Sequence, residues 1–280
     1  MASLRELKDR IASVRGTLKI TSAMKLIASS KLHKAQQYAD GLRRYGDALS
    51  DVARTLPSNA FNGRLLPIAP DAPVAIVALA SNTSLCGAFN ANVVRQALRE
   101  VENHPGATVF AIGRKMADAM RRAGYFTGED FNTLVTLAGF QGAAALADRL
   151  MAACAEGKFS RVILVYTHCA SLSRQEVRVS DLLPFAYGGG GDEADMEKRV
   201  LYEPAPAQIA RTLLPALIRL KLRTVCIDSF AAECAARTLA MQVATDNAEA
   251  LLSELVLEYN KGRQQKITAE ILELLGGQSL

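Results

Sequence analysis

The chain has 280 residues, half of them hydrophobic, which is enough for one sizeable core or two small domains. Its net charge of +5 is unevenly spread, because residues 1–45 hold ten Lys or Arg against three Asp or Glu. Five cysteines without a C-x-x-C pair and three scattered histidines argue against a disulfide framework and a zinc site, and favour a reducing compartment.

The basic start of the chain suits an acidic protein surface, nucleic acid or anionic lipid, with a solvated helix face as the simpler alternative. Nucleic acid is not expected, since aromatic residues do not alternate with these charges and no recognised binding module is present. The longest apolar run, Val74–Ala80, is far shorter than the roughly 20 residues of a membrane span, and the first residues lack the apolar core of a secretory signal. We therefore expect a soluble protein that can still be peripheral to a membrane.

Residues 1–57 are predicted to form one long helix. Two apolar runs repeat at intervals of three and four residues, as in a coiled coil: Leu4, Leu7, Ile11, Val14 and Leu18, then Tyr38, Leu42, Tyr45, Leu49, Val52 and Leu56. Between them, Ala28–Ala35 weakens the stripe without a helix breaker. Ser3 and Glu6 have the spacing of a capping box, and Pro57 ends the helix.

Residues 70–186 are predicted to form a central Rossmann-like α/β domain. Buried strands are expected at Pro73–Ala80, Thr108–Gly113 and Arg161–His168, an edge strand at Glu176–Phe185, and helices near Asn90–Val101, Arg114–Arg122 and Gln141–Ala155. Residues 187–206 contain a Gly-rich acidic stretch and read as a flexible connection.

Residues 207–280 predict a second long helix, in which Pro215 introduces a kink or delays the start. Its apolar face is expected to include Leu251, Leu255, Tyr259, Ile267, Ile271 and Leu274. An isolated helix of this length has no core for its stripe. The two terminal helices are therefore predicted to pair as a long antiparallel coiled coil.

The loop Ser81–Asn90 lies between a strand and a helix, where phosphate-binding loops occur. It has a single glycine and matches neither nucleotide-binding fingerprint. Cys86 could act as a nucleophile, but neither His104 nor His168 can be identified as its base. A tight turn with a buried thiol is the better interpretation, so no catalytic, cofactor-binding or metal-binding residue is expected.

Four stretches resemble the gamma subunit of F-type ATP synthases: Ile11–Gln36, Leu85–Asn90 (LCGAFN), Leu201–Pro206 (LYEPAP) and Ala235–Gly277. The resemblance implies a central-stalk rotor subunit that couples ion translocation, of H+ or Na+, to ATP synthesis or hydrolysis at beta-subunit sites. This chain would itself be non-catalytic and hold no cofactor. Implied partners are the alpha and beta subunits of the F1 hexamer, epsilon and the c-ring, with one copy per complex. The implied location is peripheral, on the cytoplasmic face of a bacterial inner membrane.

The matching motifs imply three sets of contact residues. The beta-subunit contacts are Arg263, Gln264, Thr268, Met24 and Arg237; the apolar bearing tip is Ile271, Leu272, Leu274, Leu275 and Leu280; the ring-side contacts are Tyr202 and Glu203. Arg263, Gln264 and Thr268 could each instead be an ordinary exposed helix residue, and Met24 could be core packing.

The sequence also departs from the family. Ala205 stands where an acidic residue is usual, Gln242 where a Lys is usual, and Asn82–Ser84 lose an Asp and an Arg. Two alternatives stay open beside the rotor: a coiled-coil scaffold that does not rotate, and an enzyme that uses Cys86.

Overall fold

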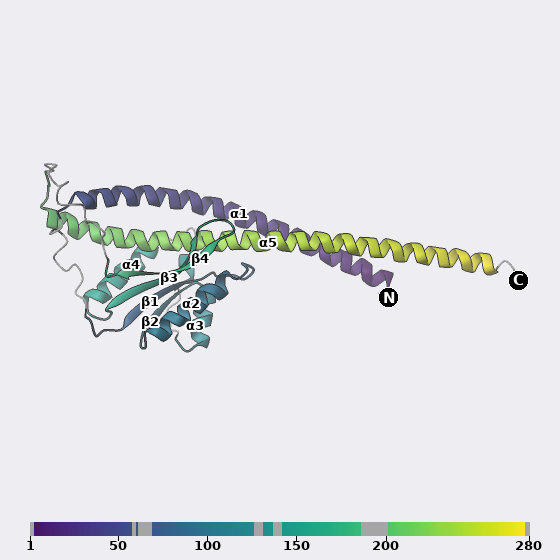
Figure 1. Cartoon of the computed structure of the whole chain (residues 1–280), viewed down its shortest axis with the longest axis horizontal. Helices are drawn as coiled ribbons and strands as arrows, with labels where there is room; N and C mark the ends of the chain where they lie inside the picture. Colours follow the sequence, from purple (N-terminus) through teal and green to yellow (C-terminus); the bar gives the residue numbers. More distant parts are fainter. Residues whose placement is uncertain are drawn as a thin grey trace. The chain divides into compact units, whose positions relative to one another are not determined.

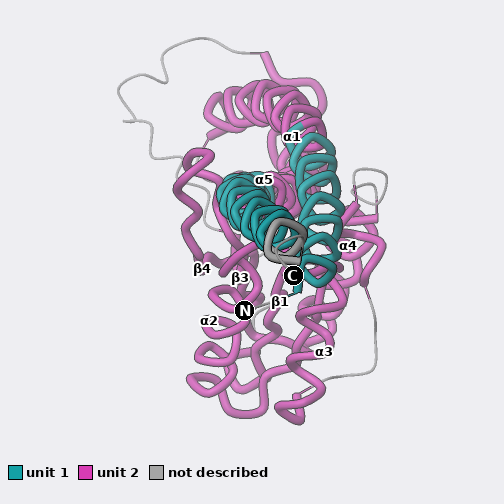
Figure 2. Tube along the Cα trace, turned by 90° about the vertical axis from the view of Figure 1, so that its right-hand side faces the viewer, with its two compact units in different colours: residues 1–29, 237–280 teal, residues 30–236 magenta. Residues whose placement is uncertain are grey.

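The structure, a computed structural model, describes residues 3–57, 60, 69–125, 131–136, 142–185 and 201–277, with side chains up to residue 272. The chain divides into two compact units, coloured separately in Figure 2. The coiled-coil unit comprises Met1–Ser29 and Arg237–Leu280, and the α/β unit comprises Ser30–Ala236. Each is described by itself below.

Two long helices run through both units (Figure 1). Helix α1 spans Leu4–Thr55 and helix α5 spans Pro206–Gly277. The predicted capping box at the start of α1 is confirmed, because the Ser3 amide donates to Glu6 Oε2 at 2.9 Å and the Glu6 amide donates to Ser3 Oγ at 3.2 Å. Pro215 lies inside α5 and does not end it.

The α/β unit contains a four-stranded mixed sheet in the order β2-β1-β3-β4. Its strands are β1 (Val74–Leu79), β2 (Thr108–Ile112), β3 (Arg161–Cys169) and β4 (Gln175–Leu183). Strand β1 pairs in parallel with β2 and β3, whereas β4 is an antiparallel edge strand. The remaining elements are α2 (Phe89–Asn103), α3 (Arg114–Arg122), α4 (Gly142–Ala155) and a 3-10 turn, η2 (Asn132–Val135), that was not predicted. The predicted α/β fold class with terminal helices is confirmed.

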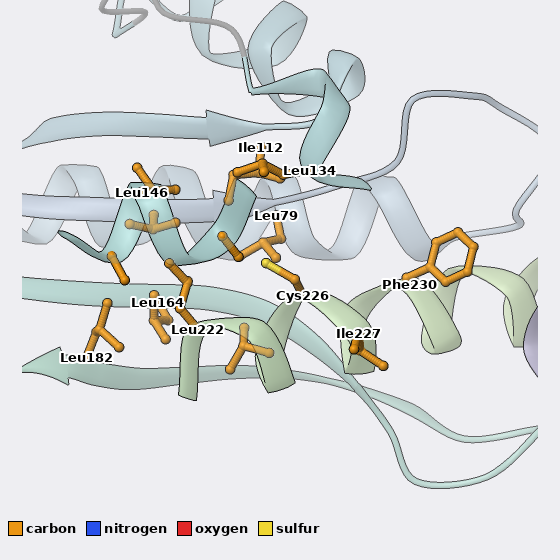
Figure 3. Packing of buried hydrophobic residues seen from close by; sticks show 14 of the residues in the cluster. Leu79, Ile112, Leu134, Leu146, Leu164, Leu182, Leu222, Cys226, Ile227 and Phe230 are labelled. Carbon is orange, nitrogen blue, oxygen red and sulfur yellow. The ribbon is translucent and has the colours of Figure 1, made fainter. Parts of the chain in front are cut away.

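Both faces of the parallel part of this sheet are covered, which explains why β1 and β2 are almost entirely apolar, whereas the edge strand β4 carries polar residues. On one face Val77 and Leu164 pack with α4 and with the first half of α5, including Leu222 and Phe230 (Figure 3). On the opposite face the alternate strand residues, such as Ile76, pack against α2 and α3. Helix α5 therefore forms a layer of the α/β unit and is also one of the two helices of the coiled coil.

Buried positions recur every three or four residues along all of α1. The fully buried ones are Leu7, Ile11, Thr21, Ala28, Leu32, Ala35, Ala53 and Leu56, with Val14, Leu18, Lys25, Ala39, Leu42, Gly46 and Leu49 partly buried between them. We call this series the seam. Ala28–Ala35 does not weaken it, because Leu32 is buried between two buried alanines.

The expectation that Tyr38, Tyr45 and Val52 belong to the seam was wrong. Their side chains are 58%, 54% and 48% exposed. The seam passes instead through smaller residues, which let α5 come close: a Cβ added to Gly46 would lie 3.2 Å from Leu220 Cδ2.

We predict that Gly113→Ala severely destabilises the α/β unit. Gly113 has φ +94°, and an added Cβ would lie 2.1 Å from the Ala80 carbonyl oxygen, so the backbone would have to move. The expected loss in the free energy of unfolding, measured by urea denaturation, is about 3 kcal/mol or more. The matched variant is Gly106→Ala, at φ +84° with nothing within 4 Å, which should lose only about 1–2 kcal/mol. Equal losses for the two variants would contradict this explanation.

Candidate subunit-binding site

In the coiled-coil unit the two helices pair in an antiparallel sense around a narrow apolar seam. Leu7 and Ile11 of α1 pack with Leu255 of α5, all buried, while Thr21 meets Thr245 further along. The α5 side of the seam consists of Met241, Thr245, Ala248, Leu252, Leu255, Tyr259 and Gly262. Leu251 was expected on this face, but it is 41% exposed and Leu252 takes the place.

One level of this seam is polar. Thr245 Oγ1 donates to Thr21 Oγ1 at 3.0 Å, and both residues are buried. One turn along, Lys25 Nζ donates to Gln242 Oε1 at 2.9 Å, and Gln242 Nε2 donates to Asp246 Oδ1 at 2.7 Å. Where relatives are expected to carry a Lys at position 242, this chain has an amide there and places a cation opposite it on α1.

Away from the seam, large aliphatic side chains remain exposed in the coiled-coil unit. On α5 they are Leu239 (40%), Val243 (51%), Leu251 (41%), Leu257 (71%), Ile267 (47%), Ile271 (51%) and Leu272 (64%); on α1 they are Ile20 (62%), Leu26 (67%) and Ile27 (56%). Exposed charged residues such as Asp246, Glu249 and Glu254 lie between Val243 and Leu257, so the α5 set consists of separate apolar positions outside the seam. This number of exposed large aliphatic side chains is typical of a surface that another protein covers.

Arg263, Gln264 and Thr268 lie within two turns on this exposed part of α5. The Thr268 hydroxyl donates to the Gln264 carbonyl oxygen at 2.9 Å, so its proton is used within the helix while its oxygen can still accept a hydrogen bond. Among the described residues, Arg263 makes neither an ion pair nor a hydrogen bond, whereas the nearby Lys266 pairs with Glu270 at 3.8 Å. The guanidinium of Arg263 is therefore available to a partner carboxylate, which it could hold with two parallel bonds.

The other expected beta-subunit contacts also lie in the coiled-coil unit. Met24 is partly buried beside the seam, between its positions Thr21 and Lys25. Arg237 is partly buried and already interacts within the chain. Of the expected bearing tip, Ile271 and Leu272 are 51% and 64% exposed. The side chains of Leu274 and Leu275, and all of Leu280, lie outside the described part of the chain.

The expected ring-side residues belong to the α/β unit. The Tyr202 hydroxyl donates to the Thr55 carbonyl oxygen, and its ring packs on a small core that contains Leu56 and Leu213. Tyr202 therefore fastens the start of α5 to the end of α1, whereas Glu203 is exposed. This structural task could not be read from the sequence, because the two contacting segments lie far apart in it.

The loop after β1 is held by hydrogen bonds of its own side chains. Asn82 Oδ1 accepts the Arg114 amide at 3.0 Å, and Asn82 Nδ2 donates to the Asn132 carbonyl oxygen at 2.9 Å. An Asp at position 82, as expected in relatives, could make the first bond but not the second. Cys86 is 1% exposed and accepts a hydrogen bond from Asn90 Nδ2 at 3.1 Å.

Helix α5 closes the carboxyl end of the sheet, where α/β proteins of this kind bind ligands. Cys86 and Phe89 pack against Ala232 of α5. Next to them, Asp228 of α5 accepts from His168 Nδ1 at 2.6 Å and from the Cys169 amide at 3.0 Å. No histidine is among the hydrogen-bond partners of Cys86 in the described residues, so nothing there supports the enzyme alternative.

Over the described residues, no group of three or more His, Cys, Asp or Glu side chains could hold a metal ion. Within the same residues, no helix is both long and apolar enough to cross a membrane.

These features define a class: a subunit built from an antiparallel helix pair, with exposed apolar side chains outside its seam, and an α/β unit. Residues 3–279 match the family model described as ATP synthase. The ATP synthase gamma chain of Bacteroides thetaiotaomicron is 40% identical over 302 aligned positions, covering 99% of both chains. That of Flavobacterium johnsoniae is 35% identical, covering 99% of this chain and 98% of the relative.

A solved structure of the Euglena gracilis mitochondrial ATP synthase, OSCP/F1/c-ring, contains a chain of similar fold with a TM-score of 0.65 and 20% identity, covering 99% of this chain and 93% of that one. The chain belongs to the ATP synthase gamma chain family, the central-stalk subunits of F-type ATP synthases.

We predict that Ala205→Asp stabilises the start of α5. Ala205 directly precedes Pro206, the first residue of the helix, and its carbonyl oxygen already accepts the Gln208 amide at 2.8 Å. An Asp side chain at this N-cap position would accept a further amide of the first turn, worth about 1 kcal/mol. Slower hydrogen exchange of the Ala207 and Gln208 amides would report it. Ala205→Leu, which offers no acceptor, should leave exchange unchanged or faster.

We predict that Cys169 alone among the five thiols reacts with maleimide in the folded chain at pH 8. It is partly buried, and the other four cysteines are fully buried. Burial raises the pKa of the Cys226 thiol to about 12, so this group stays neutral and unreactive. Burial, and then the charge of Asp228, also raise the pKa of Cys169, so it should react more slowly than free cysteine. Mass spectrometry of labelled peptides would test this; labelling of Cys226 as fast as Cys169 would contradict it.

Proposed function

We propose that this chain turns as the rotor shaft of an F-type ATP synthase and mechanically couples ion translocation through a membrane ring to ATP synthesis or hydrolysis. The observation that carries the proposal is the set of exposed aliphatic side chains on α5, with the unpaired Arg263 near Ile267, in a chain of the gamma family.

In this proposal the helices of residues 1–57 and 207–280 form the shaft and residues 70–186 form the domain nearer the ring, with residues 187–206 connecting them. The shaft stands inside a hexamer of alpha and beta subunits, while epsilon and the c-ring bind the other end. One copy would serve each complex. The chain would be peripheral, on the cytoplasmic face of a bacterial membrane, and the ring would decide whether H+ or Na+ is the coupling ion.

The coupling follows from unequal contacts around the shaft. Its surface is uneven, because exposed aliphatic residues such as Val243 and Leu257 lie close to the polar Lys25–Gln242–Asp246 group. Each beta subunit meets a different side at a given angle, so the shaft favours a different conformation in each of them. Apolar contacts are non-directional and resist turning less than fixed ion pairs do. ATP chemistry would remain in the beta subunits.

We assign Arg263, Gln264 and Thr268 to hydrogen bonds with a beta-subunit loop, and Met24 and Arg237 to contacts lower on the shaft. Ile271, Leu272, Leu274, Leu275 and Leu280 would form the apolar bearing tip. Glu203, which is exposed, would contact the ring, with Tyr202 positioning it through its bond to Thr55.

The test is to purify the complex through a tag on this chain from its native membranes. Stoichiometric alpha and beta subunits with ATPase activity are expected, and a lone chain would overturn the proposal. Arg263→Ala should then lower ATP-driven ion pumping about tenfold or more, since a hydrogen bond to a charged group contributes about 1.5–3 kcal/mol. The pumping rate of Arg263→Lys should lie between those of the unmodified complex and Arg263→Ala, because lysine keeps the charge but cannot form two parallel hydrogen bonds.

Lys266→Ala is the matched control, because Lys266 is already paired with Glu270 on the same helix. Arg263→Ala with undiminished pumping in an assembled complex would favour the scaffold that does not rotate.

A further inference from the structure

A second apolar stripe runs along α1 within the α/β unit. It consists of Tyr38, Gly41, Tyr45, Ala48 and Val52, at the same alternating intervals as the seam. Each of these residues precedes a seam residue by one position, so this lateral stripe is turned about 100° away from the seam. Its three large side chains are 58%, 54% and 48% exposed, so nothing in the described chain covers them.

The lateral stripe alternates large and small residues. Gly41 lies between Tyr38 and Tyr45, and a Cβ added there would meet nothing within 4 Å. Glycine is a poor residue for a helix interior, and no neighbour within the chain requires it at this position. Alternation of aromatic knobs with small gaps is the surface that a second helix packs into, with its own side chains over Gly41 and Ala48.

The charges around this stripe identify the partner's chemistry. Lys31 and Lys34 continue its spacing toward the N-terminus and are exposed, as is Arg44. Within the described residues none of these three forms an ion pair, whereas Arg43 pairs with Asp40 and Arg54 with Asp51. The cations left over favour a partner that carries carboxylates beside its apolar residues.

We propose that an acidic amphipathic helix of a neighbouring subunit docks along the lateral stripe. Its apolar residues, spaced three and four apart, fill the gaps at Gly41 and Ala48, and its carboxylates meet Lys31 and Lys34. From Tyr38 to Val52 the stripe is about 21 Å long, room for roughly four turns of the docked helix. The docking rests on the proposed function only in that the helix comes from the same complex.

The first experiment measures maleimide labelling of single cysteines in a Cys169→Ser background. Tyr45→Cys lies on the lateral stripe, and Arg43→Cys is the control, about 160° away around α1. Both should label at similar rates in the isolated chain. In the complex, Tyr45→Cys should label at least tenfold more slowly and Arg43→Cys within twofold of its isolated rate.

The outcomes separate this docking from the proposed function. If alpha and beta subunits co-purify with ATPase activity and Tyr45→Cys still labels freely, the docking is wrong and the proposed function stands. If alpha and beta are absent, both fail.

A second variant changes the gap itself. Gly41→Leu should raise the Tm of the isolated chain by about 2–4 °C, because leucine favours the helix and has open space. In the complex it should restore fast labelling of Tyr45→Cys, while Arg43→Leu should not. Unchanged protection in the Gly41→Leu complex would overturn the proposal.

A benzophenone amino acid at position 45 would then identify the occupant. An adduct on a carboxylate-bearing helical segment of another subunit supports the docking. An adduct on a second copy of this chain, or on lipid, overturns it.

Discussion

A coiled coil of two helices can bury only one stripe on each, and the rest of this molecule depends on that limit. Beyond Arg237, α5 has α1 as its partner, and the side chains away from the seam, such as Leu257, stay in solvent. Before that residue the same helix also meets a sheet, and Ile218, Leu222 and Cys234 are buried with their neighbours. Helix α5 is therefore buried on several faces before Arg237 and on one face after it, although the helix itself is continuous.

This double use of α5 also removes the ligand site that the sheet would otherwise offer. The polar groups at the carboxyl end of β3 are taken by Asp228, which binds His168 and the Cys169 amide. Ala232 covers Cys86 in the same region. In other proteins this kind of α/β fold binds nucleotides at this end of the sheet; here the same end packs against helix α5.

The sequence was a good guide where burial and spacing act together. Strands β1, β2 and β3 are short runs rich in apolar and β-branched residues, and their predicted bounds agree with the structure within two residues. The sequence did not identify the seam correctly in the second half of α1, where two stripes have the same spacing. Tyr38 and Tyr45 look like better seam residues than Ala39 and Gly46. Only the approach of α5 decides between them. The 3-10 turn Asn132–Val135 has no periodic signal, so it could not be predicted.

The candidate site divides in the same way. Sequence motifs pointed to Arg263 and Gln264, and the structure places them on the exposed part of α5. Nothing in the sequence indicated that Tyr202 binds the end of α1, or that Lys25 is held by Gln242 across the seam. Such pairs depend on which residues meet across the helix pair, and periodicity alone does not give that register.

The unbroken run of α5 from Pro206 to Gly277 also constrains how this gene can change length. One inserted residue would turn everything after it by about 100°, so a seam residue would leave its groove while the sheet still held the first half in place. Substitutions can be absorbed one at a time along such a helix, but insertions and deletions cannot. Length variation among relatives should therefore concentrate between the strands, and the long helix should keep its residue count even where its sequence has diverged.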